Sequence, residues 1–230
     1  MIKIRVKFTK HGPIKYVGHL DMMRYFQKAI RRAGLDVSYS EGYSPHMIMS
    51  FASPLGVGME SDAEYFDMQM NSEIEPAEAI RLLNEQMAEG VEVVQFTPLA
   101  EGAKKSMTIT SATDYIVEFR QGHNPPCRAD ELSDRIMAFM AQPEINVIKK
   151  TKKSETMTDI KPMIYRFEEA DGRLSMCLAA GSVNNLNVKL LLETFYNFCG
   201  TEYDALGCQI TRSEVYMNGE SGKLIPLYME

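Results

Sequence analysis

The sequence predicts an α+β fold of two tandem ferredoxin-like units, each with an antiparallel sheet covered by helices on one face. Several short stretches alternate apolar and polar residues, as half-buried strands do. Other stretches repeat apolar residues at three and four positions, as amphipathic helices do. The order strand, helix, strand, strand, helix, strand occurs in residues 1–102 and, with one additional strand, again in 112–230, and this is the ferredoxin-like (βαββαβ) order.

The two patterns are clearest near the N-terminus. Along 2–8, apolar residues alternate with lysine and arginine, which predicts a half-buried strand with one basic face. Along 19–33, an apolar stripe is followed by Gly34, a common helix stop. Pro76 suits a first helical position. In the first unit we predict strands at 2–8, 35–39, 62–70 and 91–99, and helices at 19–33 and 76–89.

The second unit follows a predicted linker at 100–111. The tripeptide 170–172, Ala-Asp-Gly, predicts a hairpin turn. Asn187 is a suitable N-cap, and Gly200 ends the helix that follows. In this unit we predict strands at 114–119, 145–150, 163–169, 173–180 and 208–217, and helices at 130–141 and 188–199.

The composition is that of an ordinary globular protein, with 45% hydrophobic and 24% charged residues. No apolar run approaches the ~20 residues of a membrane helix, and the alternating N-terminus lacks an apolar signal core. We therefore expect a cytoplasmic protein with no membrane partner. The four cysteines are far apart and form no CxxC pair, so we expect no metal and no cofactor.

Charge is distributed unevenly around the net value of −6. Residues 1–34 contain nine Lys/Arg and one Asp, whereas residues 35–103 contain one Arg and thirteen Asp/Glu. The first segment predicts a surface that contacts nucleic-acid phosphate or another anion; neutralisation by the acidic segment is the alternative. The predicted anion-binding residues are Lys3, Arg5, Lys7, Lys15, Arg24, Lys28, Arg31 and Arg32, with Lys10 beside them.

The segment 41–58 mixes glycine, proline and apolar residues between two predicted strands. A loop of this length is unusual unless it is functional, and its prolines and glycines favour a fixed backbone. Two histidines, His19 and His46, are the candidate catalytic residues, and a structural role as a hydrogen-bonding side chain is the favoured alternative for each. The motif-loop candidates are Asp21, Glu41, Gly42, Tyr43, Pro45, His46, Ser50, Pro54 and Gly56.

Two further charged groups have structural alternatives. Asp62 and Glu64 share one face of a predicted strand and Asp67 takes the other, so their simplest role, with Glu41, is to balance the N-terminal cations. The cluster KKTKK at 149–153 either extends an RNA-binding track or protects a strand edge.

A series of short motifs falls within the first seventy residues. It comprises Gly18, His19, Leu20, Asp21 and Arg24; Arg31, Arg32, Ala33 and Gly34; Ser40, Gly42, Tyr43, Ser44, Pro45 and His46; Ser50 and Phe51; and Pro54, Leu55, Gly56, Ser61 and Glu64. In these residues the chain resembles the radical SAM-linked protein family, a domain family of unknown function encoded beside, or fused to, a B12-binding radical SAM protein. The resemblance is specific in the first hundred residues and diffuse afterwards.

That resemblance implies an accessory module, because the CxxxCxxC motif of a radical SAM enzyme is absent from the sequence. We expect an RNA- or substrate-binding module that works with a radical SAM protein, and tRNA or rRNA as the second partner. Whether the chain has catalytic activity of its own stays open, with an accessory role favoured.

Two alternatives remain. The tandem ferredoxin-like pattern is similar to the repeat-processing endoribonucleases of CRISPR systems, which implies metal-independent cleavage with His19 as acid or base and His46 as its partner. Lys15 or Arg24 would then stabilise the phosphorane. The other alternative is a pure protein-interaction partner whose acidic 60–92 region docks the radical SAM enzyme, and charge reversal at Asp62, Glu64 and Asp67 would test it.

Overall fold

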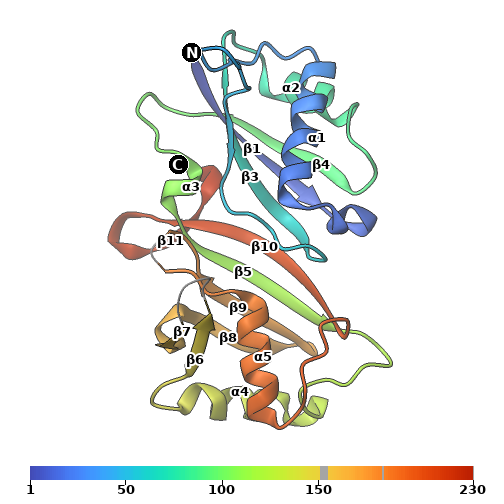
Figure 1. Cartoon of the computed structure of the whole chain (residues 1–230), viewed down its shortest axis with the longest axis vertical. Coiled ribbons are helices and arrows are strands. Elements are labelled where there is room, and N and C mark those ends of the chain that lie inside the picture. The colour runs from blue at the N-terminus through green and yellow to red at the C-terminus, as the bar shows by residue number, and fades with distance from the viewer. Residues whose placement is uncertain (151–154, 183, 230) are drawn as a thin grey trace. The chain divides into compact units, whose positions relative to one another are not determined.

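The computed structural model describes residues 1–150, 155–182 and 184–229. It is a mixed α+β structure with a mostly antiparallel sheet, which confirms the α+β part of the predicted class (Figure 1). The chain divides into two units, 1–111 with 212–230 and 112–211. The division predicted from the sequence assigned 212–230 to the second unit, but these residues pack with the first.

In unit 1 the strand order is β4-β1-β3, followed by the part of β10 that belongs to this unit. The pairs β1–β3 and β1–β4 are antiparallel, and β2 pairs with β3. A short C-terminal strand, β11, pairs with β10. The strands are β1 (Ile2–Lys10), β2 (Met49–Phe51), β3 (Glu60–Met70), β4 (Val91–Pro98), β10 (Cys208–Asn218) and β11 (Leu224–Pro226).

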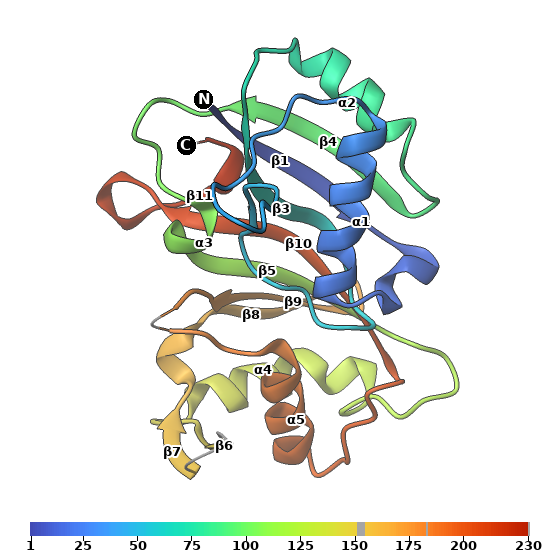
Figure 2. The same ribbon diagram turned by 45° about the horizontal axis from the view of Figure 1, so that its top comes forward.

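Helices α1 (His19–Arg32) and α2 (Pro76–Asn84) cover one face of this sheet (Figure 2). Phe26 and Ile30 of α1 are fully buried against Phe8 of β1 and Phe66 of β3, and the two rings Phe8 and Phe26 lie 4.6 Å apart. This contact explains the apolar stripe of the first helix: it supplies the core of unit 1.

The other face of β1 is covered as well. The C-terminal residues and the segment after β4 fold over it, so that Arg5 is only 1% exposed and donates to the carbonyl oxygens of Leu227 and Lys104. The prediction of a half-buried strand with an exposed basic face was wrong at this position. The cause is a contact 222 residues apart in the chain.

Unit 2 has the antiparallel order β5-β9-β8 and a separate hairpin, β6-β7. Helices α4 and α5 pack against this sheet through a cluster of aromatic rings that includes Phe139, Phe167 and Phe195. The elements are β5 (Thr110–Phe119), α4 (Leu132–Ala141), β6 (Asn146–Lys150), β7 (Glu155–Asp159), β8 (Ile164–Ala170), β9 (Arg173–Ala179) and α5 (Val188–Cys199).

Some predicted elements differ from the observed ones. The strand predicted at 35–39 is reduced to isolated bridges at Val37 and Tyr39. The predicted linker contains helix α3 (Ser106–Ile109), and strands β2, β7 and β11 were not predicted. The lysine cluster at 149–153 lies outside the residues whose side chains are described. Short 3₁₀ helices occur at Gly12–Tyr16, Ala129–Glu131, Lys161–Met163, Glu220–Gly222 and Leu227–Met229.

Candidate anion-binding site

Three strands of unit 1 bring polar side chains to one face of the sheet. The register pairs Lys3 of β1 with Gln69 of β3, and it pairs Asp67 with both Arg5 of β1 and Ser50 of β2. Because alternate residues of a strand point to the same side, these five side chains share the face opposite α1 and α2. The face is therefore polar at the junction of β1, β2 and β3.

The motif loop leads directly into this junction. The Ser40 hydroxyl accepts a hydrogen bond from the backbone N–H of His46 at 3.0 Å and contacts the His46 ring nitrogen Nδ1 at 2.8 Å. The backbone N–H of Ile48 then donates to the Ser38 carbonyl oxygen, and Ser50 follows in β2. The end of the loop that reaches the sheet is thus hydrogen-bonded to Ser38 and Ser40, which come just before the loop in the chain.

The segment before α3 closes another side. The backbone N–H of Ser106 donates to Asp67 Oδ2 at 2.5 Å, and the Lys104 carbonyl oxygen accepts from Arg5 at 3.1 Å. Lys3 Nζ donates to the Ala103 carbonyl oxygen at 2.9 Å. These contacts hold residues 103–106 beside β1 and β3, which brings two more lysines, at 104 and 105, to the same junction.

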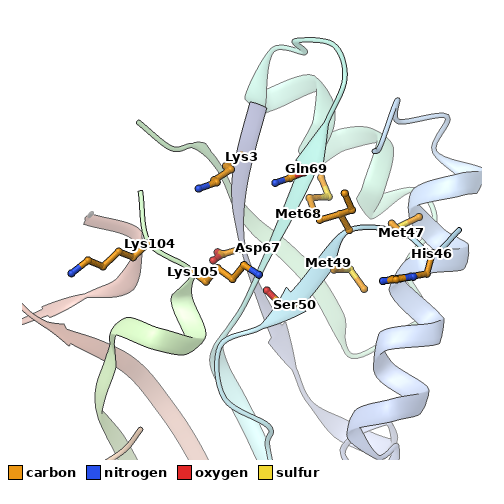
Figure 3. A pocket seen from close by; sticks show the side chains of 11 residues that line it. Lys3, His46, Met47, Met49, Ser50, Asp67, Met68, Gln69, Lys104 and Lys105 are labelled. Atoms are coloured by element: carbon orange, nitrogen blue, oxygen red, sulfur yellow. The ribbon is translucent and has the colours of Figure 1, made fainter. Parts of the chain in front are cut away.

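The three segments enclose a pocket of about 190 Å³. Figure 3 shows Lys105 extending toward Ser50, whereas Lys104 extends in the opposite direction. Lys3 and Gln69 also reach toward this face. The lining residues are Lys3, His46, Met47, Ile48, Met49, Ser50, Asp67, Met68, Gln69, Lys104 and Lys105.

The charge of the pocket is positive. Its one carboxylate, Asp67, is neutralised by the buried Arg5, whose Nε lies 2.8 Å from Asp67 Oδ1. Lys3 and Lys105 then contribute ammonium groups to the pocket lining, with the Ser50 hydroxyl and the Gln69 amide beside them. Such a set of donors suits an anion.

The other predicted cations of β1 and its following turn have carboxylate partners in unit 1. Lys7 Nζ lies 2.8 Å from Glu214 Oε2, and Lys15 Nζ lies 2.8 Å from Glu60 Oε1. Lys10 is buried, and its Nζ donates to the Val17 carbonyl oxygen at 2.7 Å. Burial lowers the pKa of Lys10, and the nearby Glu64 opposes that shift. For Lys7, Lys10 and Lys15, the structure therefore agrees with the alternative that groups inside the protein neutralise the N-terminal cations.

The predicted cations of α1 are exposed and do not line the pocket. Arg24 pairs with Asp21 at 3.2 Å, where both side chains are more than two-thirds exposed. Arg31 donates to the Gln27 carbonyl oxygen, and Arg32 donates to Gln86. The predicted cations therefore form three groups. Some pair with carboxylates inside unit 1, those of α1 are exposed on the helix surface, and Lys3 lines the pocket.

A second buried pair fixes the far end of the motif loop. Arg212 Nη1 lies 3.0 Å from Glu64 Oε1, and the guanidinium also donates to the carbonyl oxygens of Ser53 and Pro54. The Ser61 hydroxyl donates to the Arg212 carbonyl oxygen. Burial raises the pKa of Glu64, while Arg212 and Lys10 oppose that shift. Ser61 and Glu64 therefore serve to anchor the loop.

The buried carboxylates bear on the predicted docking contact. Glu64 and Asp67 are 3% and 9% exposed, and both are engaged by arginine. Asp62 alone of the three is exposed. A docking contact in the acidic 60–92 region could therefore use Asp62 but neither Glu64 nor Asp67, because those two lie inside unit 1.

The two candidate histidines line different cavities. The His19 ring packs edge-on against Phe51 with 5.2 Å between ring centroids, beside a cavity of only about 10 Å³. Burial lowers the pKa of His19. His46 is exposed at the edge of the larger pocket. Among the described residues, no group of three or more His, Cys, Asp or Glu side chains is placed to hold a metal ion.

The remaining residues predicted for the motif loop lie at the surface and outside the pocket. Glu41, Gly42, Tyr43, Pro45, Pro54 and Gly56 are all exposed. Gly42 has a φ of +107°, a backbone conformation that favours glycine. These residues do not line the pocket, so of the predicted motif-loop set it contains His46 and Ser50.

Lys104, Lys105 and Gln69 are pocket residues that the sequence analysis missed. The dipeptide at 104–105 lay in a predicted linker, so its charge carried no positional information. Gln69 lay in a correctly predicted strand, and its register opposite Lys3 was the signal that could have revealed it.

Fold and site together define an α+β protein with a cationic pocket on a sheet face. The chain belongs to the family described as an uncharacterized protein conserved in bacteria (DUF2344), whose family model matches residues 3–188. No curated protein matches the chain. In the part of the chain that the structure describes, no helix has the length and apolarity needed to cross a membrane.

One solved structure that aligns with this chain is titled "Crystal Structure of a Cbf5-Nop10-Gar1 Complex". Its TM-score is 0.45 and its sequence identity to this chain is 12%. The alignment covers 92% of this chain and 48% of the other, so this chain spans about half of the solved chain's length.

Proposed function

We propose that this protein is a cytoplasmic accessory module that binds RNA through its backbone phosphates and works with a radical SAM enzyme. One observation carries the RNA-binding part: Lys3 and Lys105 line a pocket of about 190 Å³ whose single carboxylate, Asp67, is already neutralised by Arg5. Lysine ammonium groups in such a place favour a phosphate over a neutral ligand.

The motif loop supports the same site. The loop that carries the resemblance to the radical SAM-linked family supplies His46 and Ser50 to the pocket. Its two ends are fixed, by Ser40 at one end and by Arg212 at the other. A fixed loop loses little conformational freedom when a ligand binds, and this favours a recognition role.

We also propose that both units are ferredoxin-like. In unit 1 the order β4-β1-β3, with β2 beside β3, agrees with that fold. In unit 2 the elements β5, α4, β8, β9 and α5 follow the expected sequence, with the hairpin β6-β7 as an insertion. In this proposal the sheet face opposite α1 and α2 carries the ligand in unit 1.

The ribonuclease alternative has less support. It needs His19 and His46 to act on one phosphate, but the two side chains line separate cavities, and the one beside His19 has room for about one water molecule. A binding module without cleavage therefore fits the geometry better.

The test is a titration of the purified protein with tRNA and rRNA fragments at 50 and 200 mM salt. With the two lysines Lys3 and Lys105 at phosphates of a single strand, affinity should fall about sevenfold across this range. Lys105→Glu should weaken binding at the lower salt concentration, because it replaces an attraction with a repulsion. Lys223→Glu, at an exposed lysine outside the pocket, is the matched control.

Binding that ignores salt, or that Lys223→Glu weakens as much as Lys105→Glu, would refute the phosphate-binding role of the pocket. Cleavage of labelled RNA that disappears in both His19→Ala and His46→Ala would instead establish the ribonuclease alternative. Co-purification with the proposed radical SAM partner tests the accessory role separately.

A further inference from the structure

The size, charge and enclosure of the pocket point to a narrower ligand class. We propose that it binds a terminal phosphomonoester of a nucleotide, either at the end of an RNA strand or as a free mononucleotide. This inference rests on the proposed function, because it takes the same pocket to be the phosphate site.

The charge balance favours a dianion. A phosphomonoester carries between about −1.5 and −2 charges at neutral pH, whereas an internal phosphodiester carries one. Lys3 and Lys105 approach the junction from two different segments, and Lys104 stands at its outer side (Figure 3). Arg5 and the Ser106 N–H already satisfy the Asp67 carboxylate, so this carboxylate does not compete with a ligand for Lys3 and Lys105.

The size favours one nucleotide. A cavity of about 150 Å³ accommodates benzene, and sites for drug-sized ligands begin near 300 Å³. The observed volume of about 190 Å³ lies between them, which is room for the terminal phosphate and the sugar ring of one nucleotide, with its base toward the pocket opening. The Ser50 hydroxyl and the Gln69 amide lie on the same face as hydrogen-bonding groups for a sugar or base edge.

The walls favour a strand end over a continuous strand. The pocket lies among β1 with β3, the motif loop with β2, and residues 104–105. The third wall is fastened in place by Lys3 at Ala103 and by Asp67 at Ser106. A phosphate at the end of a chain enters such a pocket with one neighbour, whereas an internal phosphate must accommodate two.

The first experiment compares adenosine 5′-monophosphate with its phosphate methyl ester, a diester of nearly the same size, by calorimetric titration. Inorganic phosphate and adenosine are the further probes. We expect the monophosphate to bind about fivefold more tightly than the methyl ester, because the ester removes one charge beside two lysines. Lys105→Gln should abolish this preference, and Lys104→Gln, whose side chain extends away, should retain it.

The second experiment uses single-stranded RNA of one sequence with a 5′-phosphate, a 3′-phosphate or neither. Tighter binding of one phosphorylated form supports a strand terminus as the source, and binding of the mononucleotide alone supports a free nucleotide. Equal, salt-dependent binding of all three RNAs, with equal binding of monophosphate and ester, would overturn this inference and leave the proposed function standing. No binding of any RNA would overturn the RNA-binding part of the proposed function, and no binding of the mononucleotide in addition would overturn this inference as well.

Discussion

Arg5 and Lys105 belong to the same face of unit 1, yet their environments are opposite. The Arg5 side chain is 1% exposed and touches Asp67, Leu227 and Lys104, whereas Lys105 is exposed at the pocket. The first cation contributes to folding, since a buried guanidinium needs its carboxylate. The second is free to meet a ligand. Cationic residues that stabilise the fold can thus be distinguished from cationic residues that bind a ligand only when the burial of each side chain is known.

The largest expected effect comes from removing the partner of Arg5. Asp67→Ala leaves a buried guanidinium without its counter-ion and the Ser106 N–H without its acceptor, so the free energy of unfolding should fall by about 3–5 kcal/mol. Urea denaturation followed by circular dichroism measures it. Asp62→Ala, at an exposed position of the same strand, is the control and should cost at most about 0.5 kcal/mol. Equal effects of the two substitutions would remove the distinction between buried and exposed charge.

A comparable loss is expected at the second buried pair. Arg212→Met removes the partner of Glu64 and the donors to the Ser53 and Pro54 carbonyl oxygens, so unfolding should become easier by about 3 kcal/mol. The double variant Arg212→Met with Glu64→Gln should recover part of the loss, because no buried charge then lacks a partner. A double variant less stable than the single one contradicts this account of the loop anchor.

An intermediate case is Glu60, which joins His11 and Lys15. Burial raises its pKa, but the bonds from Lys15 and His11 outweigh this, and the net pKa lies below 4.5. The folded state therefore holds the proton less tightly than the unfolded state. The resulting stability is present above pH 4.5 and is lost as the pH falls through the lower folded value. Glu60→Gln should flatten this part of the curve of unfolding free energy against pH, and an unchanged curve would argue against the pair.

The smallest stability effect is expected at the pocket lysine. Lys105→Gln should change the free energy of unfolding by no more than about 0.5 kcal/mol, because the side chain is exposed. We expect this substitution to lower the affinity for the ligand and to leave the free energy of unfolding nearly unchanged. Thermal denaturation of the free variant checks this, and a large destabilisation would mean that the lysine has a structural role.

These contrasts show what the sequence contained. Alternation along 2–8 and the apolar stripe along 19–33 identified β1 and α1, because both patterns report local geometry. Local patterns did not show that Leu227 returns to cover Arg5, since that contact depends on the whole chain. For the same reason, the lysines at 104 and 105 were assigned to a linker, although the neighbouring Ser106 binds Asp67.

The motif loop gives the same lesson on a smaller scale. His46 and Ser50 were predicted site residues, and both line the pocket. Leu35 to Tyr39 had the composition of a strand, but Val37 and Tyr39 form only isolated bridges. The glycines and prolines of 41–58 indicated the position of the motif loop. The hydrogen-bond partners of its residues could not be predicted, because they depend on tertiary contacts.

The most direct test compares two double variants by the salt dependence of their affinity for one RNA fragment. Lys3→Gln with Lys105→Gln removes two pocket charges, and Arg24→Gln with Lys28→Gln removes two from the exposed face of α1. The account predicts that the pocket pair lowers the slope of log affinity against log salt by about 1.4, at about 0.7 per lysine, and that the α1 pair leaves it nearly unchanged. The reverse pattern would contradict the assignment of phosphate binding to the pocket.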